Sequence, residues 1–251
     1  MNIDLNCDLG EGFGDWRMGE DAALLDIVSS ANIACGFHAG DPATMRRTCE
    51  MAVEHSVSIG AHIGFRDLVG FGRRNIDITP GDLKDETLYQ ISALAGFAHA
   101  AGSAVTYVKP HGALYHSASQ SAELADAIVS AMTESSNSLA LLGPPLSHLQ
   151  KAAEIHGIEF FPEGFADRSY TRFGKLTPRS EPGAVLADPE SATAQAIDLA
   201  STGTVITADG ITISMPVKSI CVHGDSPGAV AMAKSIKAGL INARIRVEAF
   251  T

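Results

Sequence analysis

Ionisable side chains follow the short apolar runs of this sequence at equivalent positions. Four histidines, His38, His62, His111 and His223, each lie at or just after the end of such a run. An imidazole can transfer protons near neutral pH, and it can also bind a metal ion. One histidine in such a place is more often structural, but four in equivalent places favour an active site.

Carboxylates and cations accompany these histidines. The candidate catalytic residues are Asp8, Glu11, His38, His62, Lys109, His111, Asp167, Arg168, His223 and Asp225, and the candidate substrate-binding residues are Arg73, Arg74 and Glu163. Lys109 directly follows an apolar run, and lysine is rarely buried without a partner. Such a set can exchange protons with a substrate and can stabilise developing negative charge.

A metal site is a second interpretation of the same residues. Asp8, His38 and His62 could coordinate one divalent ion, although neither an HExxH motif nor a short His-x-His spacing supports them. The absence of G-x-S-x-G disfavours a serine triad. Since G-x-G-x-x-G and Walker A motifs are also absent, nucleotide binding would depend on glycine loops and helix N-termini.

The elements that position these residues alternate between strand and helix. Seven apolar runs are expected as strands, at Ile3–Leu9, Ala31–Cys35, Ser58–Ile63, Ala104–Val108, Leu139–Leu142, Glu159–Phe161 and Ile220–Val222. Four helix starts carry an N-cap residue followed by proline, at Asp41-Pro42, Thr79-Pro80, Asp188-Pro189 and Ser226-Pro227. Alternating strands and helices predict parallel strands joined by right-handed crossovers. We expect a seven-stranded, TIM-like β/α barrel, with an open doubly wound sheet as the alternative.

In such a barrel the C-terminal strand ends open onto one face, where catalytic groups collect. The ionisable residues should therefore meet there. We expect a single domain over residues 1–251. A hairpin near 203–215 is predicted by Thr204–Thr207 and Ile211–Met215, which flank the turn residues Ala208-Asp209-Gly210.

Composition limits the class of protein. The 251 residues are 45% hydrophobic, which is enough for a sizeable core, and the net charge of −11 disfavours nucleic acid and anionic membranes as partners. Neither a signal-peptide pattern nor an apolar run of transmembrane length is present. The four cysteines lack CxxC spacing, so we expect reduced thiols and a cytoplasmic protein.

Several longer segments resemble those of the LamB/YcsF family. They are DLNCDLGE at 4–11, SANIACGFHAGD at 30–41, GFGRR at 70–74, VKPHGALY at 108–115, FADR at 165–168 and CVHGD at 221–225. The resemblance covers nearly the whole chain, with the segments in the same order. It implies a barrel of the glycoside hydrolase/deacetylase type.

The resemblance also implies a function. It points to one subunit of an ATP-dependent 5-oxoprolinase, which opens the lactam of 5-oxo-L-proline to L-glutamate with subunits B and C as partners. In that reaction Lys109 and Arg168 would stabilise oxygen charge, and a carboxylate or histidine would activate water. His223 or Asp225 would protonate the ring nitrogen, and Arg73 or Arg74 would bind the substrate carboxylate.

Two alternatives of other kinds stay open. One is a metal-dependent amidase or deacetylase that acts without ATP through Asp8, His38 and His62. The other is a non-catalytic subunit that binds a small ligand and presents it to partner proteins. The density of ionisable groups disfavours the second.

Overall fold

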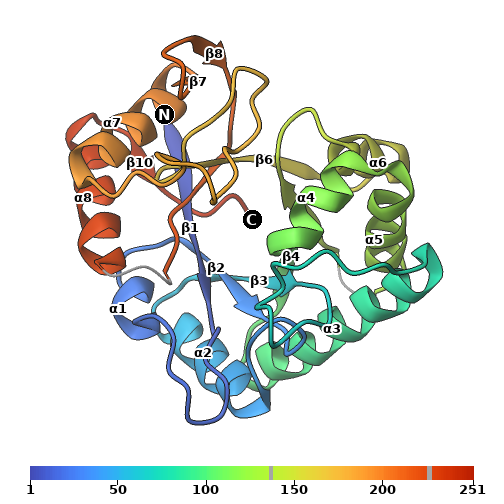
Figure 1. Cartoon of the computed structure of the whole chain (residues 1–251). Helices are drawn as coiled ribbons and strands as arrows, with labels where there is room; N and C mark the ends of the chain where they lie inside the picture. Colours follow the sequence, from blue (N-terminus) through green and yellow to red (C-terminus); the bar gives the residue numbers. More distant parts are fainter. Residues whose placement is uncertain (136–137, 225–227) are drawn as a thin grey trace.

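Seven parallel strands close into a barrel, as predicted (Figure 1). The computed structural model describes residues 1–135, 138–224 and 228–251. The barrel strands are β1 (Asn2–Leu9), β2 (Ser30–Ala34), β3 (Ser58–Ile63), β4 (Val105–Pro110), β5 (Ala140–Gly143), β6 (Phe160–Phe165) and β9 (Ser219–Cys221). Each pairs in parallel with the next, and β9 pairs back with β1 through Asp4↔Ser219, which rules out the open sheet.

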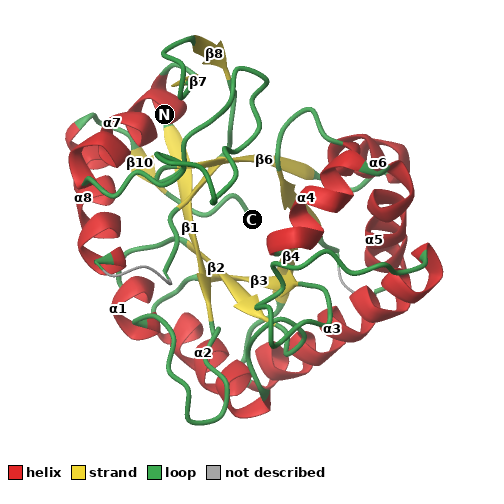
Figure 2. Cartoon of the chain, in the orientation of Figure 1, coloured by secondary structure: helices red, strands yellow, loops and turns green. Residues whose placement is uncertain are grey.

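Helices surround the barrel (Figure 2). They are α1 (Asp21–Leu25), α2 (Pro42–Glu54), α3 (Pro80–Ala100), α4 (Gly112–Gln120), α5 (Ala122–Glu134), α6 (His148–His156), α7 (Pro189–Ser201) and α8 (Ala229–Asn242). The side chains of Asp41, Thr79 and Asp188 accept hydrogen bonds from backbone N–H groups of the helices that they precede, as the N-cap patterns predict. The fourth pattern, Ser226-Pro227, lies outside the described residues.

Three short strands lie beyond the seven-stranded ring. β7 (Thr204–Ile206) and β8 (Thr212–Ser214) form an antiparallel pair within the segment expected to be a hairpin. β10 (Arg246–Val247) pairs in parallel with the beginning of β1 through Asn2↔Arg246. The chain thus returns to its first strand at the end.

The inner face of the barrel is polar along β1. Odd-numbered residues from Ile3 to Leu9 belong to the hydrophobic core, whereas Asp4, Asn6 and Asp8 bond to side chains from other strands. This follows from the period of two in a strand, which places alternate residues on opposite faces.

Two strands are longer than the apolar runs that predicted them. β4 continues through Lys109 and Pro110, and β6 continues through Glu163 to Phe165. We expected Lys109 and Glu163 to follow their strands, but both lie within them. A polar residue can occupy these strand positions because its partners are other polar groups on the inner face.

Aromatic rings fill the barrel near the beginnings of the strands. The ring centroid of Phe250 lies 4.9 Å from that of Tyr107 and 4.5 Å from that of Phe161. A Cβ atom on Gly60 would lie 2.1 Å from Cε2 of Tyr107, so any other residue at position 60 would collide with the ring. These three rings pack together inside the barrel on the side of the strand beginnings.

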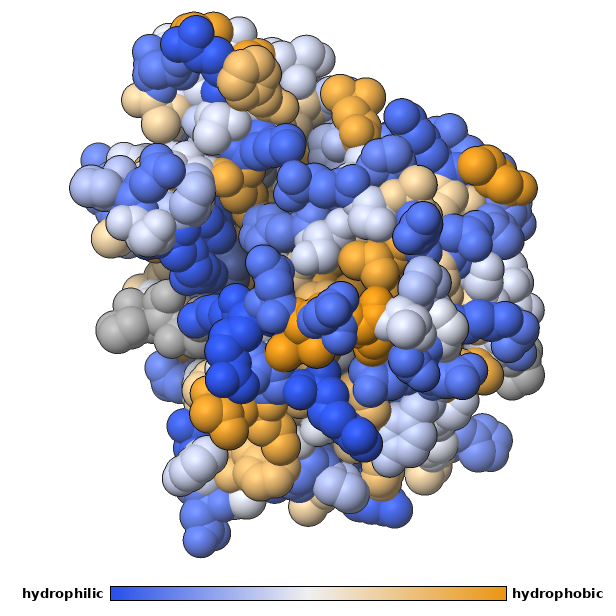
Figure 3. All heavy atoms as spheres, turned by 45° about the vertical axis from the view of Figure 1, so that its right-hand side comes forward, coloured by the Kyte–Doolittle hydropathy of each residue, from blue (hydrophilic) through white to orange (hydrophobic). Residues whose placement is uncertain are grey.

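No helix among the described residues is both long and apolar enough to cross a bilayer. Figure 3 shows hydrophilic residues over much of one face, with apolar residues in small groups between them.

Candidate functional site

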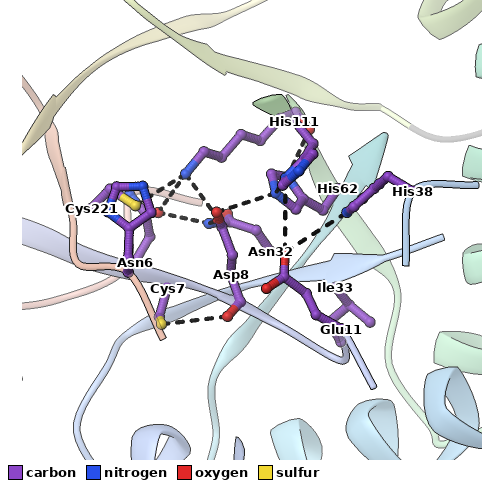
Figure 4. Close-up of polar contacts among 12 residues, drawn as sticks. Asn6, Cys7, Asp8, Glu11, Asn32, Ile33, His38, His62, His111 and Cys221 are labelled. Carbon is purple, nitrogen blue, oxygen red and sulfur yellow. Dashed lines mark hydrogen bonds and ion pairs between the residues drawn. The ribbon is translucent and has the colours of Figure 1, made fainter. Parts of the chain in front are cut away.

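Lys109 on β4 lies in the middle of a buried polar network. Its Nζ atom lies 2.8 Å from Oε1 of Glu163 and 3.1 Å from Oδ1 of Asp8. It also donates to Oδ1 of Asn6 at 3.1 Å and lies 3.2 Å from Sγ of Cys221. Figure 4 shows Asn6, Asp8 and Cys221 gathered at this point of the barrel. Strands β1, β4, β6 and β9 therefore all contribute to one network around a single cation.

The charges in this network stabilise one another. Burial by itself lowers the pKa of Lys109, but Asp8 and Glu163 outweigh it and raise that pKa well above its usual range. Burial by itself raises the pKa of Asp8, yet His62 and Lys109 bring it well below its usual value. Lys109 is thus an ammonium and Asp8 a carboxylate.

Two asparagines connect the network and were not among the predicted site residues. The amide of Asn32 donates to Oδ1 of Asp8 at 2.8 Å and to Oδ1 of Asn6 at 2.7 Å. Asn6 in turn donates to Oε1 of Glu163 at 3.0 Å. A sequence pattern could have identified Asn6 as a site residue. Asp4, Asn6 and Asp8 alternate with apolar residues, and residues two apart in a strand share a face.

A second group, the histidine cluster, consists of Glu11, His38, His62 and His111. One potential ligand atom from each lies within 4.8 Å of all the others, and all four residues are buried. The residues come from the C-terminal ends of β1 to β4, which are neighbours in the barrel. The structure therefore brings together three of the four predicted histidines and one predicted carboxylate.

Burial lowers the pKa of two of these histidines. It lowers the pKa of His38 well below its usual value, and the neighbouring His111 and His62 add to the effect. Burial and His62 likewise lower the pKa of His111 well below the usual value. Neutral imidazoles are the form that binds metal ions.

His223 lies apart from the cluster and pairs with Asp167. Its Nδ1 atom lies 2.8 and 2.9 Å from the two carboxylate oxygens of Asp167, and the His223 ring stacks on Phe165 with centroids 5.4 Å apart. Burial raises the pKa of Asp167, but His223 outweighs it and the pKa is lowered. Asp225, a further predicted catalytic residue, lies outside the described residues.

The predicted arginines bond mainly to loops. Arg168 is buried, and its guanidinium donates to the backbone oxygens of Ala184 at 3.0 Å and Thr177 at 2.6 Å. Arg74 forms an ion pair with Asp67. The Arg73 guanidinium lies 4.9 Å from the ring centre of Phe71. Their contacts with a substrate stay predictions.

The comparisons with known proteins identify the family of the chain. The LamB/YcsF family matches residues 3–251. A protein of Nocardia farcinica, named as the A subunit of 5-oxoprolinase, is 59% identical over 250 residues, which cover 100% of both chains. The crystal structure of a lactam utilization protein from Thermus thermophilus has 39% identity, a TM-score of 0.95 and coverage of 100% of both chains.

A more distant likeness concerns the fold alone. A family 4 carbohydrate esterase from Streptomyces lividans has 10% identity and a TM-score of 0.51, over 100% of this chain and 93% of that chain. The barrel architecture is therefore shared with that carbohydrate esterase.

Proposed function

The chain belongs to the LamB/YcsF family, and on that premise we propose that it is the A subunit of an ATP-dependent 5-oxoprolinase. This enzyme opens the lactam of 5-oxo-L-proline to L-glutamate. The observation that carries the proposal is 59% identity, over the full length of both chains, with a protein named as the A subunit of 5-oxoprolinase. That name supports an assembly of several chains, and we propose subunits B and C as its other members.

The chemistry must overcome amide resonance, which makes the lactam carbonyl a poor electrophile. ATP would phosphorylate the lactam oxygen, and water would attack the activated ring carbon. Cleavage of the C–N bond would then give an acyl phosphate, and a second water would release phosphate and L-glutamate. The departing nitrogen needs a proton, and the attacking water must lose one.

The polar network and the His223–Asp167 pair support this chemistry. The side chains of Asp8 and His223 are 11% and 12% exposed, so each retains access from outside the barrel. Asp8 would accept the proton of the attacking water, and His223 would protonate the ring nitrogen. The Lys109 ammonium would stabilise charge on the carbonyl or phosphoryl oxygen. Arg73 would pair with the substrate carboxylate.

The site of ATP is a separate part of the proposal. The chain lacks both common phosphate-binding motifs, so we propose that ATP binds in the assembled enzyme with contributions from subunits B and C. All four cysteines are free and buried, which supports a reducing, cytoplasmic location.

A second candidate function rests on the histidine cluster. Three histidines and a carboxylate could hold an ion that activates water, so a metal-dependent amidase acting without ATP is the alternative. Glutamate release from 5-oxo-L-proline separates the two, measured for this chain alone and with B and C, each with and without ATP. Release only with partners and ATP would support the first proposal. Release by the lone chain without ATP, if a chelator stops it, would support the second proposal. No release in any mixture would contradict both.

Lys109→Met tests the role of the buried cation. We expect glutamate release by the assembled enzyme to fall by about 10²–10³-fold, because the oxygen charge loses its partner. The substitution also leaves Asp8 and Glu163 without their cation, so we expect a loss of about 3–5 kcal/mol in unfolding free energy. Activity per folded molecule is therefore the quantity to measure. Lys151→Met, on the exposed side of α6, is the control. Normal turnover of folded Lys109→Met would rule out this role.

A further inference from the structure

His38 is buried without a hydrogen bond. Its exposed fraction is 0%, and neither ring nitrogen has a hydrogen-bond partner among the described residues, although Oε1 of Glu11 lies 3.8 Å from Nε2. Each nitrogen of an imidazole carries either an N–H group or a lone pair. Burying such a group without a hydrogen-bond partner costs about 1–3 kcal/mol. A ligand at this position would offset that cost.

The protonation of the other two histidines in the cluster is set by backbone oxygens. Nδ1 of His62 lies 3.1 Å from the carbonyl oxygen of Lys109, and Nε2 of His111 lies 2.9 Å from that of Phe71. A carbonyl oxygen only accepts, so each of these two nitrogens donates an N–H. In the tautomers that bind a metal ion, the lone pairs are then at Nε2 of His62 and Nδ1 of His111.

The two ring nitrogens that are not bonded to carbonyl groups face each other. Nε2 of His62 and Nδ1 of His111 are 2.9 Å apart. Carboxylate oxygens lie beside them, since Oε1 of Glu11 lies 3.8 Å from Nδ1 of His111 and Oδ2 of Asp8 lies 3.3 Å from Nε2 of His62. A cation among these atoms would be bound by groups that already converge on one point.

We propose that Glu11, His38, His62 and His111 hold one divalent transition-metal ion, with zinc the best match to the donors. The ligand atoms would be Oε1 of Glu11, Nε2 of His38 and of His62, and Nδ1 of His111. Three imidazoles and one carboxylate suit zinc, whose tetrahedral bonds of about 2.0–2.1 Å place ligand atoms roughly 3.3 Å apart. The separations here of 2.9 and 3.8 Å lie on either side of that value. The proposal assigns the ligand atoms and the metal of the histidine cluster, and it does not depend on the 5-oxoprolinase function.

The ligand set differs from the sequence hypothesis of Asp8, His38 and His62. Oδ1 of Asp8 already bonds to Asn32 and Lys109, whereas Glu11 reaches two of the histidines (Figure 4). The carbonyl bonds at His62 and His111 are the outer contacts that orient metal-binding imidazoles in proteins.

The cluster is held in place by close packing. The rings of His38 and His111 stack with centroids 3.9 Å apart. A Cβ atom on Gly72 would lie 2.7 Å from Cβ of His38 and 2.8 Å from Cδ2 of His111, so the loop backbone can approach both rings only as glycine. The ligands are therefore arranged before an ion arrives.

A metal titration of the purified chain tests the proposal. After treatment with a chelator, the chain is titrated with Co²⁺, followed by its visible absorption, and with Zn²⁺ by competition. We expect one equivalent to bind, with the absorption of a four-coordinate cobalt site. Glu11→Gln and His38→Ala should each weaken binding by about 100-fold or more, since even outer-contact substitutions weaken it by about 10–100-fold. His156→Ala, at a histidine paired with Asp126 on the surface, should bind as the unaltered chain does.

Glu11→Gln preserves the size of the side chain, so weaker binding with an unchanged circular dichroism spectrum and melting temperature would separate ligand loss from unfolding. In the competing arrangement no metal ion is bound. His62 is then an imidazolium that donates to the carbonyl oxygen of Lys109 and to the carboxylate of Asp8. The absence of stoichiometric binding, or binding that Glu11→Gln and His38→Ala leave unchanged, would overturn the metal site. These titrations contain no substrate, ATP or partner, so their failure differs from a failure of glutamate release.

Discussion

At the scale of single residues, Asp4 is a carboxyl group with an unusual environment. It accepts hydrogen bonds from the hydroxyls of Ser29 at 2.7 Å, Ser30 at 2.6 Å and Ser219. Burial outweighs these bonds, and with a smaller effect from Glu163 it raises the pKa of Asp4 to about 6. The protonated form of Asp4 therefore persists to a higher pH in the folded protein than in the unfolded chain.

This pKa predicts a pH dependence of stability. The folded pKa of about 6 exceeds the ordinary value of 3.8, so the contribution of protonated Asp4 is fully present below pH 4 and is lost as the pH rises through 6. The loss is on the order of 3 kcal/mol. In urea unfolding from pH 4 to 7.5, the unaltered chain should lose stability relative to Asp4→Asn, which cannot ionise. Parallel curves for the two chains would contradict the prediction.

At the scale of elements, β3 and β4 approach each other closely through Gly60 and Tyr107. An added methyl group at position 60 would collide with the Tyr107 ring, whose hydroxyl donates to Asn32 at 2.7 Å. We expect Gly60→Ala to lower the unfolding free energy by about 3 kcal/mol, at the upper end of the usual cost of overpacking. Chemical denaturation would measure the change.

Gly96 provides a matched control within α3. A Cβ atom there would meet nothing within 4 Å, and alanine favours a helix over glycine by about 0.5–1 kcal/mol. Gly96→Ala should thus stabilise the protein by about that amount. A Gly60→Ala chain as stable as the unaltered one would show that the ring of Tyr107 moves aside at little cost.

Strand and helix alternation, with proline after an N-cap residue, predicted parallel strands and favoured a closed barrel, and the pairing of β1 with β9 then ruled out the open sheet. The limits of β4 and β6 were not predictable from apolar runs, because Lys109 and Glu163 continue the strands on a polar inner face. The sequence also predicted that the histidines would gather at one end. It could not predict that His223 would pair with Asp167 away from the others, since this depends on how β6 and β9 are placed.

The sequence also could not predict which loop groups the long side chains contact. Arg168 bonds to backbone oxygens at positions 177 and 184, and those contacts depend on the path of the loop that follows β6. The tautomers of His62 and His111 likewise depend on which carbonyl groups lie beside them. The sequence shows which charged or imidazole side chains could take part in chemistry, but only the three-dimensional structure shows which groups they contact.

At the scale of the whole molecule, Phe250 joins the end of the described chain to the barrel interior. Its ring contacts Tyr107 and Phe161, and Thr251 bonds to Ser58 and Thr106 at the beginnings of β3 and β4. Phe250→Ala should lower the unfolding free energy by about 2 kcal/mol, less than for a fully buried phenylalanine because Phe250 is half-buried. Thermal and urea unfolding would measure this.

The control for this substitution is Phe173→Ala. Phe173 is 82% exposed, so we expect a change within about 0.5 kcal/mol. Equal stability losses in the two variants would show that the loss of an aromatic side chain, and not the closure of the barrel, is responsible.

The pairing of β1 with β9 and β10 also affects how the protein is made. Asp4 and its partner Ser219 are 215 positions apart, so the ring of strands cannot close until the ribosome has synthesised β9. Until then β1 presents an unpaired edge and its inward carboxylates lack their hydroxyl partners. Nascent chains of this kind fold slowly because the closing contact spans so many residues, and they expose strand edges on which chaperones act and aggregation begins.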